Sequence, residues 1–404
     1  MLHYLGPAVG QVPLSTWDQV EAAAAGGLLE EGQWVELKET IGPSNKPVNL
    51  ELARDLASLS VNGGVLVFGV RDKTFEVVGC DTTRLPDRIS EVARMSIFPP
   101  LSPVIYPVVT KDGDPMRGVL VAEVPPSPVA PHMVDSRYWG RSSTGKRTLS
   151  DPEVRQLMES RSSTEAAFAA RLLAMADEDP LGPKVQGHPT GNGHIYLLAV
   201  PSAPVVAQGI DLDLMSVARG TAATPGDPGP VASLYHDARD PLGRALAYPP
   251  AREDPVERRR EDSMGYLLCR DDDSSLEFVS GGGTLWRDSS PSQREPMEVV
   301  GVRTVVRGVQ EFLRLVQTLS MSVWGYSGPW RVGIHITNLA GKAVSFDDFH
   351  GRGMTFPRDT YTAQIDTTPA TWAESADGEA KRLLSGFLRA IGRETWELDQ
   401  VASR

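Results

Sequence analysis

An almost unbroken apolar stretch runs from Val65 to Val70 and comes directly after the pair Gly63-Gly64. A run of this length next to glycines is typical of a strand that is buried on both faces of a sheet. The two glycines provide the backbone freedom for a tight turn into the strand. We therefore predict a buried strand, with the carboxylate of Asp72 at its exit.

A shorter stretch upstream alternates between two kinds of position. Trp34, Glu36 and Lys38 fall on one face of a predicted strand, and Val35 and Leu37 fall on the other. This follows because successive side chains of a strand point to opposite faces of the sheet. The pattern predicts that Glu36 and Lys38 project side by side.

Helical spacing marks the segment between the two predicted strands. Leu52, Leu56 and Leu59 recur at intervals of three and four residues, which places them on one face of a helix. Asn49 is a suitable N-cap residue for this helix. We therefore predict a helix that begins after Asn49 and continues to about Val61.

The order of these patterns predicts an α+β protein whose first part has α/β character. A chain of 404 residues is long enough for two or three domains. Residues 1–162 are predicted to form a mixed, mainly antiparallel sheet with flanking helices, and residues 181–404 a separate α+β domain. Residues 163–180 are predicted to be a helical connector between the two domains.

Two further predictions concern the connections. Helices are predicted over residues 152–161 and 164–180, on either side of the end of the first domain. The stretch 220–262 is rich in proline, glycine and charged residues, and it is predicted to form long loops. The strands of the second domain are therefore expected before and after this stretch.

Composition restricts the compartment and the partners. The chain has only two cysteines, Cys80 and Cys269, which is typical of a reducing compartment and excludes a cysteine-rich zinc site. Neither a membrane-spanning apolar run nor a signal peptide is recognisable, so we expect a cytoplasmic protein without membrane contact. The net charge is −12, and residues 1–160 carry 15 basic and 20 acidic residues, a net charge of −5. Binding of a polyanion would therefore need a local basic patch.

Three acidic residues are candidates for a metal site. Glu31, Glu36 and Asp72 are expected to converge at one edge of the predicted sheet, where their like charges repel unless a cation joins them. Ligand sets made only of oxygen favour Mg²⁺ or Mn²⁺ over zinc. Lys38, beside Glu36, would balance the charge of a reacting phosphate. Glu30 is an alternative to Glu31 as a ligand. The alternative interpretation of the whole set is that these are ordinary acidic residues of the surface.

A basic stretch with two aromatic residues and no acid occupies residues 137–147. Its cations could contact backbone phosphates, and an exposed base could stack on an aromatic ring. The alternative is a solvated hairpin whose aromatic side chains pack inward. The candidate nucleic-acid-binding residues of this stretch are Arg137, Tyr138, Arg141, Lys146 and Arg147.

A near P-loop motif and one histidine in or near this stretch suggest chemistry that the surrounding residues do not favour. Gly140, Gly145 and Lys146 have the spacing of a phosphate-binding P-loop, but Arg147 replaces the Ser or Thr that holds magnesium, and no helix is predicted to begin at Lys146. ATP binding through this motif is therefore not favoured. His132 could position a phosphate or act as a general acid, but a structural, hydrogen-bonded histidine is the favoured interpretation.

The spaced motifs together resemble the Schlafen AlbA_2 family, a domain of bacterial proteins and of the vertebrate Schlafen proteins. The resemblance covers roughly residues 15–160. The matching positions are Glu31, Glu36-Leu37-Lys38, Gly63-Gly64, Gly69-Val70, Asp72, Val78-Gly79, Pro99-Pro100, Pro131-His132, Tyr138 and Arg141.

This resemblance implies an AlbA_2-type fold and a nuclease activity. In nuclease-active relatives, residues that match Glu31, Glu36 and Asp72 form the catalytic set, and the substrate is structured RNA such as tRNA. The resemblance thus predicts a Schlafen-like, metal-dependent endonuclease that acts on tRNA-like RNA or, as a less favoured substrate, on DNA, with Mg²⁺ or Mn²⁺ as cofactor. Vertebrate Schlafens hold nucleic acid between two such lobes, so a chain with one lobe is expected to form a homo-oligomer, most simply a dimer.

A second interpretation of function remains open. The first domain could bind nucleic acid without cleaving it, as a regulator with a sensing C-terminal domain. Residues 181–404 could then serve as a sensor or as an oligomerisation module, and they resemble no family that we recognise. Cleavage with a divalent ion would separate the two interpretations.

Overall fold

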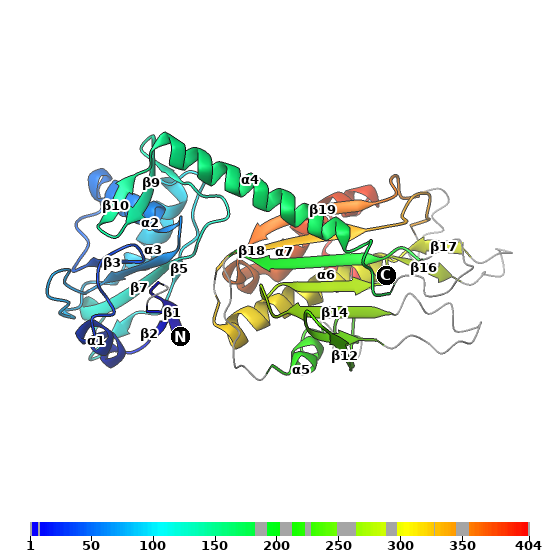
Figure 1. Ribbon diagram of the computed structural model, residues 1–404, viewed down its shortest axis with the longest axis horizontal. Coiled ribbons are helices and arrows are strands. Elements are labelled where there is room, and N and C mark those ends of the chain that lie inside the picture. The colour runs from blue at the N-terminus through cyan, green and yellow to red at the C-terminus, as the bar shows by residue number, and fades with distance from the viewer. Residues whose placement is uncertain are drawn as a thin grey trace. The chain divides into compact units, whose positions relative to one another are not determined.

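The computed structural model divides the chain into two compact units (Figure 1). The first unit comprises residues 1–165 with 327–329, and the second comprises residues 166–326 with 330–404. The structure describes residues 2–6, 9–181, 192–202, 212–222, 228–248, 264–287, 297–326, 328–344 and 355–402.

The sheet of the first unit is mixed and mainly antiparallel. Its strand order is β3 (Val35–Lys38), β4 (Gly64–Phe68), β7 (Gly118–Val124) and β5 (Val104–Ile105), and β6 (Val109–Thr110) also pairs with β7. Only the β3–β4 pair is parallel among these pairs. The predicted sheet type is therefore confirmed. Further short elements of this unit are β1 (Leu2–Tyr4), β2 (Gln11–Pro13), η1 (Pro115–Arg117) and β8 (Met133–Val134).

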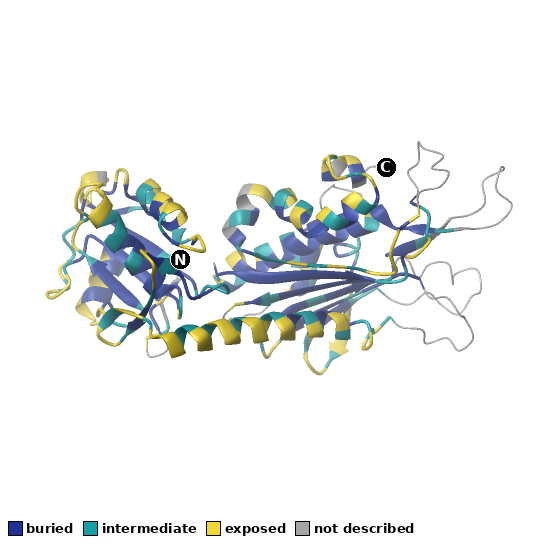
Figure 2. Cartoon of the chain, turned by 90° about the horizontal axis from the view of Figure 1, so that it is seen from above, coloured by how far each residue is buried: buried dark blue, intermediate teal, exposed yellow. Residues whose placement is uncertain are grey.

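Helices cover both faces of this sheet, so its central strand is buried as predicted. On one face α2 (Lys46–Leu59) and α3 (Leu85–Met95) pack over Leu66 and Phe68, and on the other α1 (Trp17–Ala25) shares a core with Val65 and Val67. All four β4 side chains are at most 1% exposed. Figure 2 shows the inner strands of this unit in the dark blue of buried residues.

Two glycines allow the strands of this sheet to approach one another. A Cβ atom on Gly64 would lie 2.3 Å from the carbonyl oxygen of Trp34, the atom to which Val65 N–H donates. At Gly69, where φ is +93°, a Cβ atom would lie 2.8 Å from the carbonyl oxygen of Gly118. Both positions therefore require glycine, because any side chain would push a neighbouring strand away.

Helix α2 begins earlier than predicted. Its N-cap is Asn45, whose side chain accepts the backbone N–H of Val48 at 3.1 Å, and Pro47 lies in its first turn. Asn49, the predicted cap, instead accepts a hydrogen bond from Arg88 Nε at 2.9 Å. The predicted start was wrong because Pro47 belongs to the helix, and proline is well suited to the first turn of a helix.

The basic stretch forms a hairpin that lies beside α2 (Figure 1). Strands β9 (Arg137–Ser142) and β10 (Gly145–Thr148) pair antiparallel, with Arg141 opposite Lys146. Strand β8 extends this hairpin to a three-stranded sheet. Arg141 and Lys146 are therefore neighbours on the part of the hairpin next to α2.

One continuous helix, α4 (Asp151–Ala174), replaces the two helices that were predicted over 152–161 and 164–180. The residues at the junction of the two predictions, Ser162, Ser163 and Thr164, are polar but do not break the helix. Thr164 Oγ1 donates to the carbonyl oxygen of Ser160 at 2.8 Å, which satisfies the hydroxyl inside the helix.

The second unit contains an antiparallel sheet of seven strands with the order β12-β13-β14-β15-β11-β18-β19, so the α+β class is confirmed. The elements of this unit are β11 (Ile195–Pro201), α5 (Leu214–Arg219), β12 (His236–Asp240), β13 (Gly243–Ala247), β14 (Gly265–Arg270), β15 (Leu276–Ser280), β16 (Thr284–Arg287), β17 (Met297–Val300), α6 (Val302–Thr318), a π-helical turn (Leu319–Trp324), β18 (Trp330–Ile336), β19 (Tyr361–Thr367), α7 (Pro369–Ala390) and α8 (Leu398–Ala402).

The hairpin β12–β13 corrects the prediction of long loops over 220–262. Strand β12 is an edge strand that carries mainly charged side chains, so it lacks the apolar alternation by which strands are recognised. Residues 223–227 and 249–262 of the stretch lie outside the described residues.

Strand β11, inside the sheet of the second unit, is buried on both faces. In β11, Ile195 and Leu197 belong to the large core with α6 and α7, and Tyr196 and Leu198 pack with Phe168 of α4. The alternation of β11 therefore places one set of side chains under each layer of helices.

Candidate active site

The register of the first unit's sheet sets the direction of Glu36 and Lys38. Glu36 lies opposite Leu66 and Lys38 opposite Phe68 in the β3–β4 ladder. Leu66 and Phe68 belong to the core on the α2 face. Glu36 and Lys38 therefore project from β3 toward α2, side by side as predicted.

Two cations hold the carboxylate of Glu36, which is only 7% exposed. Lys38 Nζ lies 2.5 Å from its Oε1, and Arg141 Nη2 lies 2.7 Å from its Oε2. Burial alone would raise the pKa of Glu36, but Lys38 and Arg141 together lower it below the ordinary value. The arrangement thus keeps a buried glutamate charged.

Arg141 also ties the hairpin to the start of β3. Its Nε donates to the carbonyl oxygen of Gly32 at 2.8 Å, and its Nη2 donates to that of Val35 at 3.2 Å. The residue is buried, at 5% exposure. Arg141 therefore points into the domain, whereas a nucleic-acid contact would need it at the surface.

Glu31 and Asp72 face each other at the exposed part of the site. Glu31 Oε1 accepts the backbone N–H of Leu37 at 3.0 Å. Loss of hydration raises the pKa of Glu31 above its ordinary value, and the negative charges of Glu36 and Asp72 and a side-chain hydrogen bond with Asp72 raise it further. Neighbouring carboxylates repel each other, so this pair would favour a bound cation.

The three predicted acids do not form a ready set of metal ligands. Within the described residues, no group of three His, Cys, Asp or Glu side chains could hold a metal ion. In addition, Lys38 and Arg141 already occupy both oxygens of Glu36. Glu31 and Asp72 fit a hard cation by their oxygen donors and their mutual repulsion. An ion shared by all three acids stays a prediction.

Asp55 of α2 is the residue of this site that the sequence analysis missed. It is fully buried; Lys38 Nζ lies 3.2 Å from its Oδ2, and Lys146 Nζ forms an ion pair with its Oδ1. Burial raises the pKa of Asp55, as does the negative charge of Glu36, against the lowering effect of Lys38 and Lys146. The sequence held a signal, because Asp55 interrupts the apolar face of the predicted helix.

The basic stretch is free of acids in the sequence but not in space. Three of its four cations form ion pairs with acids from other segments. The pairs are Arg141 with Glu36, Lys146 with Asp55 and Glu51, and Arg147 with Glu153. The fourth cation, Arg137, is exposed, and among the described residues no acid forms an ion pair with it. Most of the positive charge expected here for phosphate contact is therefore neutralised internally.

The two aromatic residues of the stretch are Tyr138 and Trp139, and the contacts of Trp139 are those of a structural hairpin. Trp139 packs inward: its Nε1 donates to the carbonyl oxygen of Val134 at 3.2 Å, and Arg54 lies over its ring at 5.2 Å. Tyr138 is half-buried. The near P-loop motif lies in this hairpin, and Gly145 begins strand β10 where a P-loop needs a helix. The prediction that no helix begins at Lys146 is therefore confirmed.

His132 is a structural histidine, which confirms the favoured interpretation. Its Nδ1 lies 2.6 Å from the carbonyl oxygen of Pro99, and its Nε2 lies 2.7 Å from Ser127 Oγ. A carbonyl oxygen only accepts, so Nδ1 carries the proton and Nε2 accepts from the serine hydroxyl. Both ring nitrogens are thus occupied, and burial lowers the pKa of His132.

This lowered pKa predicts a loss of stability in mild acid. Below the ordinary histidine pKa of 6.5, the unfolded chain takes up a proton that the folded protein resists. Stability should therefore fall as the pH drops from 6.5 toward the folded-state pKa, by at most about 1.4 kcal/mol per pH unit. Urea unfolding at several pH values would measure this slope. His132→Gln should be less stable but should have a shallower slope, and an unchanged slope would contradict the prediction.

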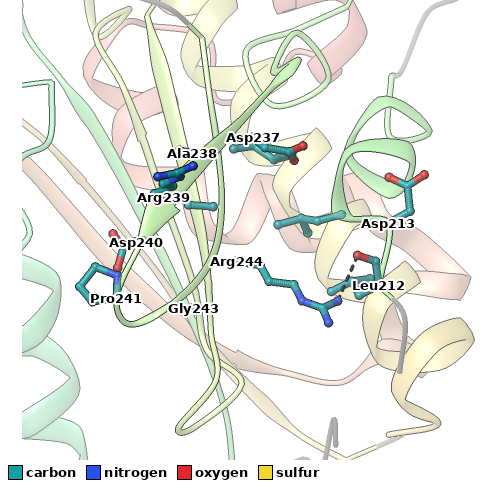
Figure 3. A pocket seen from close by; sticks show the side chains of 12 residues that line it. Leu212, Asp213, Asp237, Ala238, Arg239, Asp240, Pro241, Gly243 and Arg244 are labelled. Atoms are coloured by element: carbon teal, nitrogen blue, oxygen red, sulfur yellow. Dashed lines mark hydrogen bonds between the residues drawn. The ribbon is translucent and has the colours of Figure 1, made fainter. Parts of the chain in front are cut away.

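An open hollow of about 700 Å³ lies in the second unit, between α5 and the β12–β13 hairpin (Figure 3). Two of the charged side chains that line it have structural tasks. Arg244 donates to the carbonyl oxygen of Leu212 at 3.1 Å, and Asp213 caps α5 through the backbone N–H of Ser216. Among the described residues that line the hollow, none is a buried polar group that points to a ligand.

Comparison with known proteins identifies the first unit. Residues 31–150 match the family model described as Schlafen, AlbA_2, and this range contains every predicted site residue. The chain is also similar to the crystal structure of the DIP2311 protein from Corynebacterium diphtheriae, with 15% identity and a TM-score of 0.25. This match covers 50% of the chain and 33% of that protein. No curated protein matches the chain.

Among the helices of the described residues, none has the length and apolar character needed to cross a membrane.

The family match suggests a function related to nucleic acids. The matched range, the sheet and the order of the motifs all place the resemblance in the first unit. The N-terminal part of this chain is a Schlafen AlbA_2 domain, over residues 31–150.

Proposed function

We propose that the first unit is a divalent-metal-dependent endonuclease that cleaves structured, tRNA-like RNA or, as a less favoured substrate, DNA. The observation that carries the proposal is the exposed pair of carboxylates, Glu31 and Asp72, which repel each other beside the buried Glu36. Oxygen donors of this kind favour Mg²⁺ or Mn²⁺. The AlbA_2 match supports a nucleic acid as substrate.

The residues of the site would have separate tasks. Glu31 and Asp72 would hold the ion, which supplies Lewis-acid stabilisation of phosphodiester oxygens when it is bound. Lys38, whose side chain is 29% exposed, would direct an N–H toward a phosphate oxygen. Glu36 would keep Lys38 in place, because it accepts a hydrogen bond from the lysine and is itself fixed by Arg141.

A regulator that binds nucleic acid without cleaving it is the second candidate. The engagement of both Glu36 oxygens by Lys38 and Arg141 favours this function over catalysis, because it leaves that carboxylate no free oxygen for a metal ion. In that case the second unit would sense a signal or mediate assembly. The same surface would still bind nucleic acid, but the acids would only shape it.

A cleavage assay separates the two candidates. The full chain is incubated with tRNA, single-stranded DNA and double-stranded DNA, each with Mn²⁺, with Mg²⁺ or with EDTA. The proposed function requires cleavage with at least one ion and none with EDTA. If the chain binds a nucleic acid but cleaves none under any condition, the endonuclease proposal is wrong and the regulator remains.

Arg137 should contribute one phosphate contact. It is exposed at the start of β9, and Arg147 on β10 is engaged by Glu153 Oε2 at 2.9 Å. Arg137→Ala should therefore reduce the slope of log K against log salt by roughly 0.7 to 0.9. Fluorescence anisotropy with labelled tRNA over a range of salt concentrations measures this slope. Arg147→Ala is the matched control, and an equal change in both variants would contradict the assignment.

The dimer expected from the sequence remains a proposal. With three cations of the hairpin paired internally, one domain offers little free positive charge. Two copies that place their Arg137 residues along one RNA would provide more phosphate contacts. Light scattering with and without tRNA would detect such a dimer, and a monomer under both conditions would exclude it.

A further inference from the structure

Asp55 is a buried acid that no proposed step of the reaction uses directly. It lies on α2 behind Lys38 and is 0% exposed. Its Oδ1 pairs with Lys146, and its Oδ2 lies 3.2 Å from Lys38 Nζ. Within the described part of the chain, Oδ2 accepts no hydrogen bond. An apolar residue would complete the apolar face of α2 more simply, because a buried carboxylate is costly unless its partners compensate.

The position of Asp55 determines how the amine of Lys38 can point. A lysine amine is a flexible donor with three N–H groups. Glu36 Oε1 lies 2.5 Å from this amine on one side, and Asp55 Oδ2 lies 3.2 Å from it on the other. Two anions from different elements, β3 and α2, therefore fix its direction. An N–H that points at neither carboxylate is left for an oxygen of the substrate phosphate.

We propose that Asp55 is a positioning residue of this site: it holds Lys38 so that one N–H of the amine faces the phosphodiester. This inference rests on the proposed nuclease function for its effect on rate. The contact itself, between the carboxylate of Asp55 and the amine of Lys38, does not depend on that function and has its own measurement.

A purely structural task for Asp55 is the competing explanation. Through Lys146, Asp55 also fastens the β9–β10 hairpin to α2. Glu51, one turn earlier on α2, contacts Lys146 as well, at 2.5 Å, but no contact joins it to Lys38 among the described residues. Glu51→Gln therefore removes a carboxylate from the same helix and the same lysine, and it leaves Lys38 untouched.

A double-mutant cycle with single-turnover cleavage of tRNA distinguishes the two tasks. Asp55→Asn should slow cleavage by roughly 10- to 100-fold, the loss typical when a residue that orients a group of the active site is removed. The Kd for tRNA should be unchanged or lower. In a Lys38→Met background, the same substitution should change the rate by less than about threefold, because it acts through Lys38. Glu51→Gln should match the wild type. Independent, multiplicative effects of Asp55→Asn and Lys38→Met would overturn the proposal.

A second measurement needs no cleavage. Acylation of Lys38 by an N-hydroxysuccinimide ester, followed by peptide mass spectrometry, should be several-fold faster in Asp55→Asn than in wild type or Glu51→Gln. If wild type cleaves no nucleic acid but this difference appears, the proposed function fails and the positioning of Lys38 stands. Unchanged labelling overturns the positioning itself. If Asp55→Asn does not fold by circular dichroism, labelling is compared in Asp55→Asn/Lys146→Gln, which removes both charges of the buried pair.

Discussion

Asp72→Asn should bind tRNA at least as tightly as the wild type and cleave it at least roughly 100-fold more slowly. The two effects have different causes. The substitution removes a negative charge beside the path of the phosphates, which favours binding of a polyanion. It also removes one of the two exposed carboxylates that would hold the ion, so phosphate stabilisation in the transition state is lost. Salt-dependent binding and single-turnover cleavage of the same tRNA measure both effects.

Asp112→Asn is the matched control for this prediction. Asp112 is exposed in the turn after β6, and its substitution changes the net charge by the same amount. It should leave cleavage unchanged and alter binding only slightly. If Asp72→Asn cleaves as fast as Asp112→Asn, the carboxylate of Asp72 has no part in catalysis, and the pair with Glu31 is an ordinary surface feature.

Local patterns predicted the part of the site that lies on β3 and β4. The apolar run and the adjacent alternation are properties of single strands, and each strand keeps its period whatever packs on it. The side-by-side placement of Glu36 and Lys38 follows from that period alone. Asp72 was found by the same reasoning, because it stands at the exit of the buried strand.

The partners of the cations could not be predicted in this way. Arg141 and Glu36 are 105 positions apart, and Lys146 and Asp55 are 91 apart. The pairing depends on where the hairpin packs against α2, which no pattern inside residues 137–147 encodes. Asp55 was detectable as an acid in an apolar helical face, but the sequence did not indicate which cations would face it.

Arg141→Met should lower the free energy of unfolding by about 3–5 kcal/mol, because it leaves Glu36 as a buried charge with one cation fewer. The guanidinium also makes hydrogen bonds to the carbonyl oxygens of Gly32 and Val35, and these would lose a donor. Arg147→Met is the matched control on the same hairpin. Its ion pair with Glu153 is exposed, so the loss should stay below about 1 kcal/mol. Urea unfolding followed by circular dichroism measures both.

The companion variant Arg141→Met/Glu36→Gln identifies the cause of this loss. Glutamine keeps the shape of Glu36 and removes its charge, so the double variant should recover part of the stability that Arg141→Met alone loses.

The stability of Arg141→Met also bears on nucleic-acid binding. If Arg141→Met is no less stable than Arg147→Met but weakens tRNA binding and lowers its salt slope, Arg141 is free to contact phosphate and the buried pair with Glu36 does not form in solution. If stability falls as expected, any weakened binding by Arg141→Met reflects the loss of the fold around β3, and Arg137 is the cation of this hairpin that reports on phosphate contact.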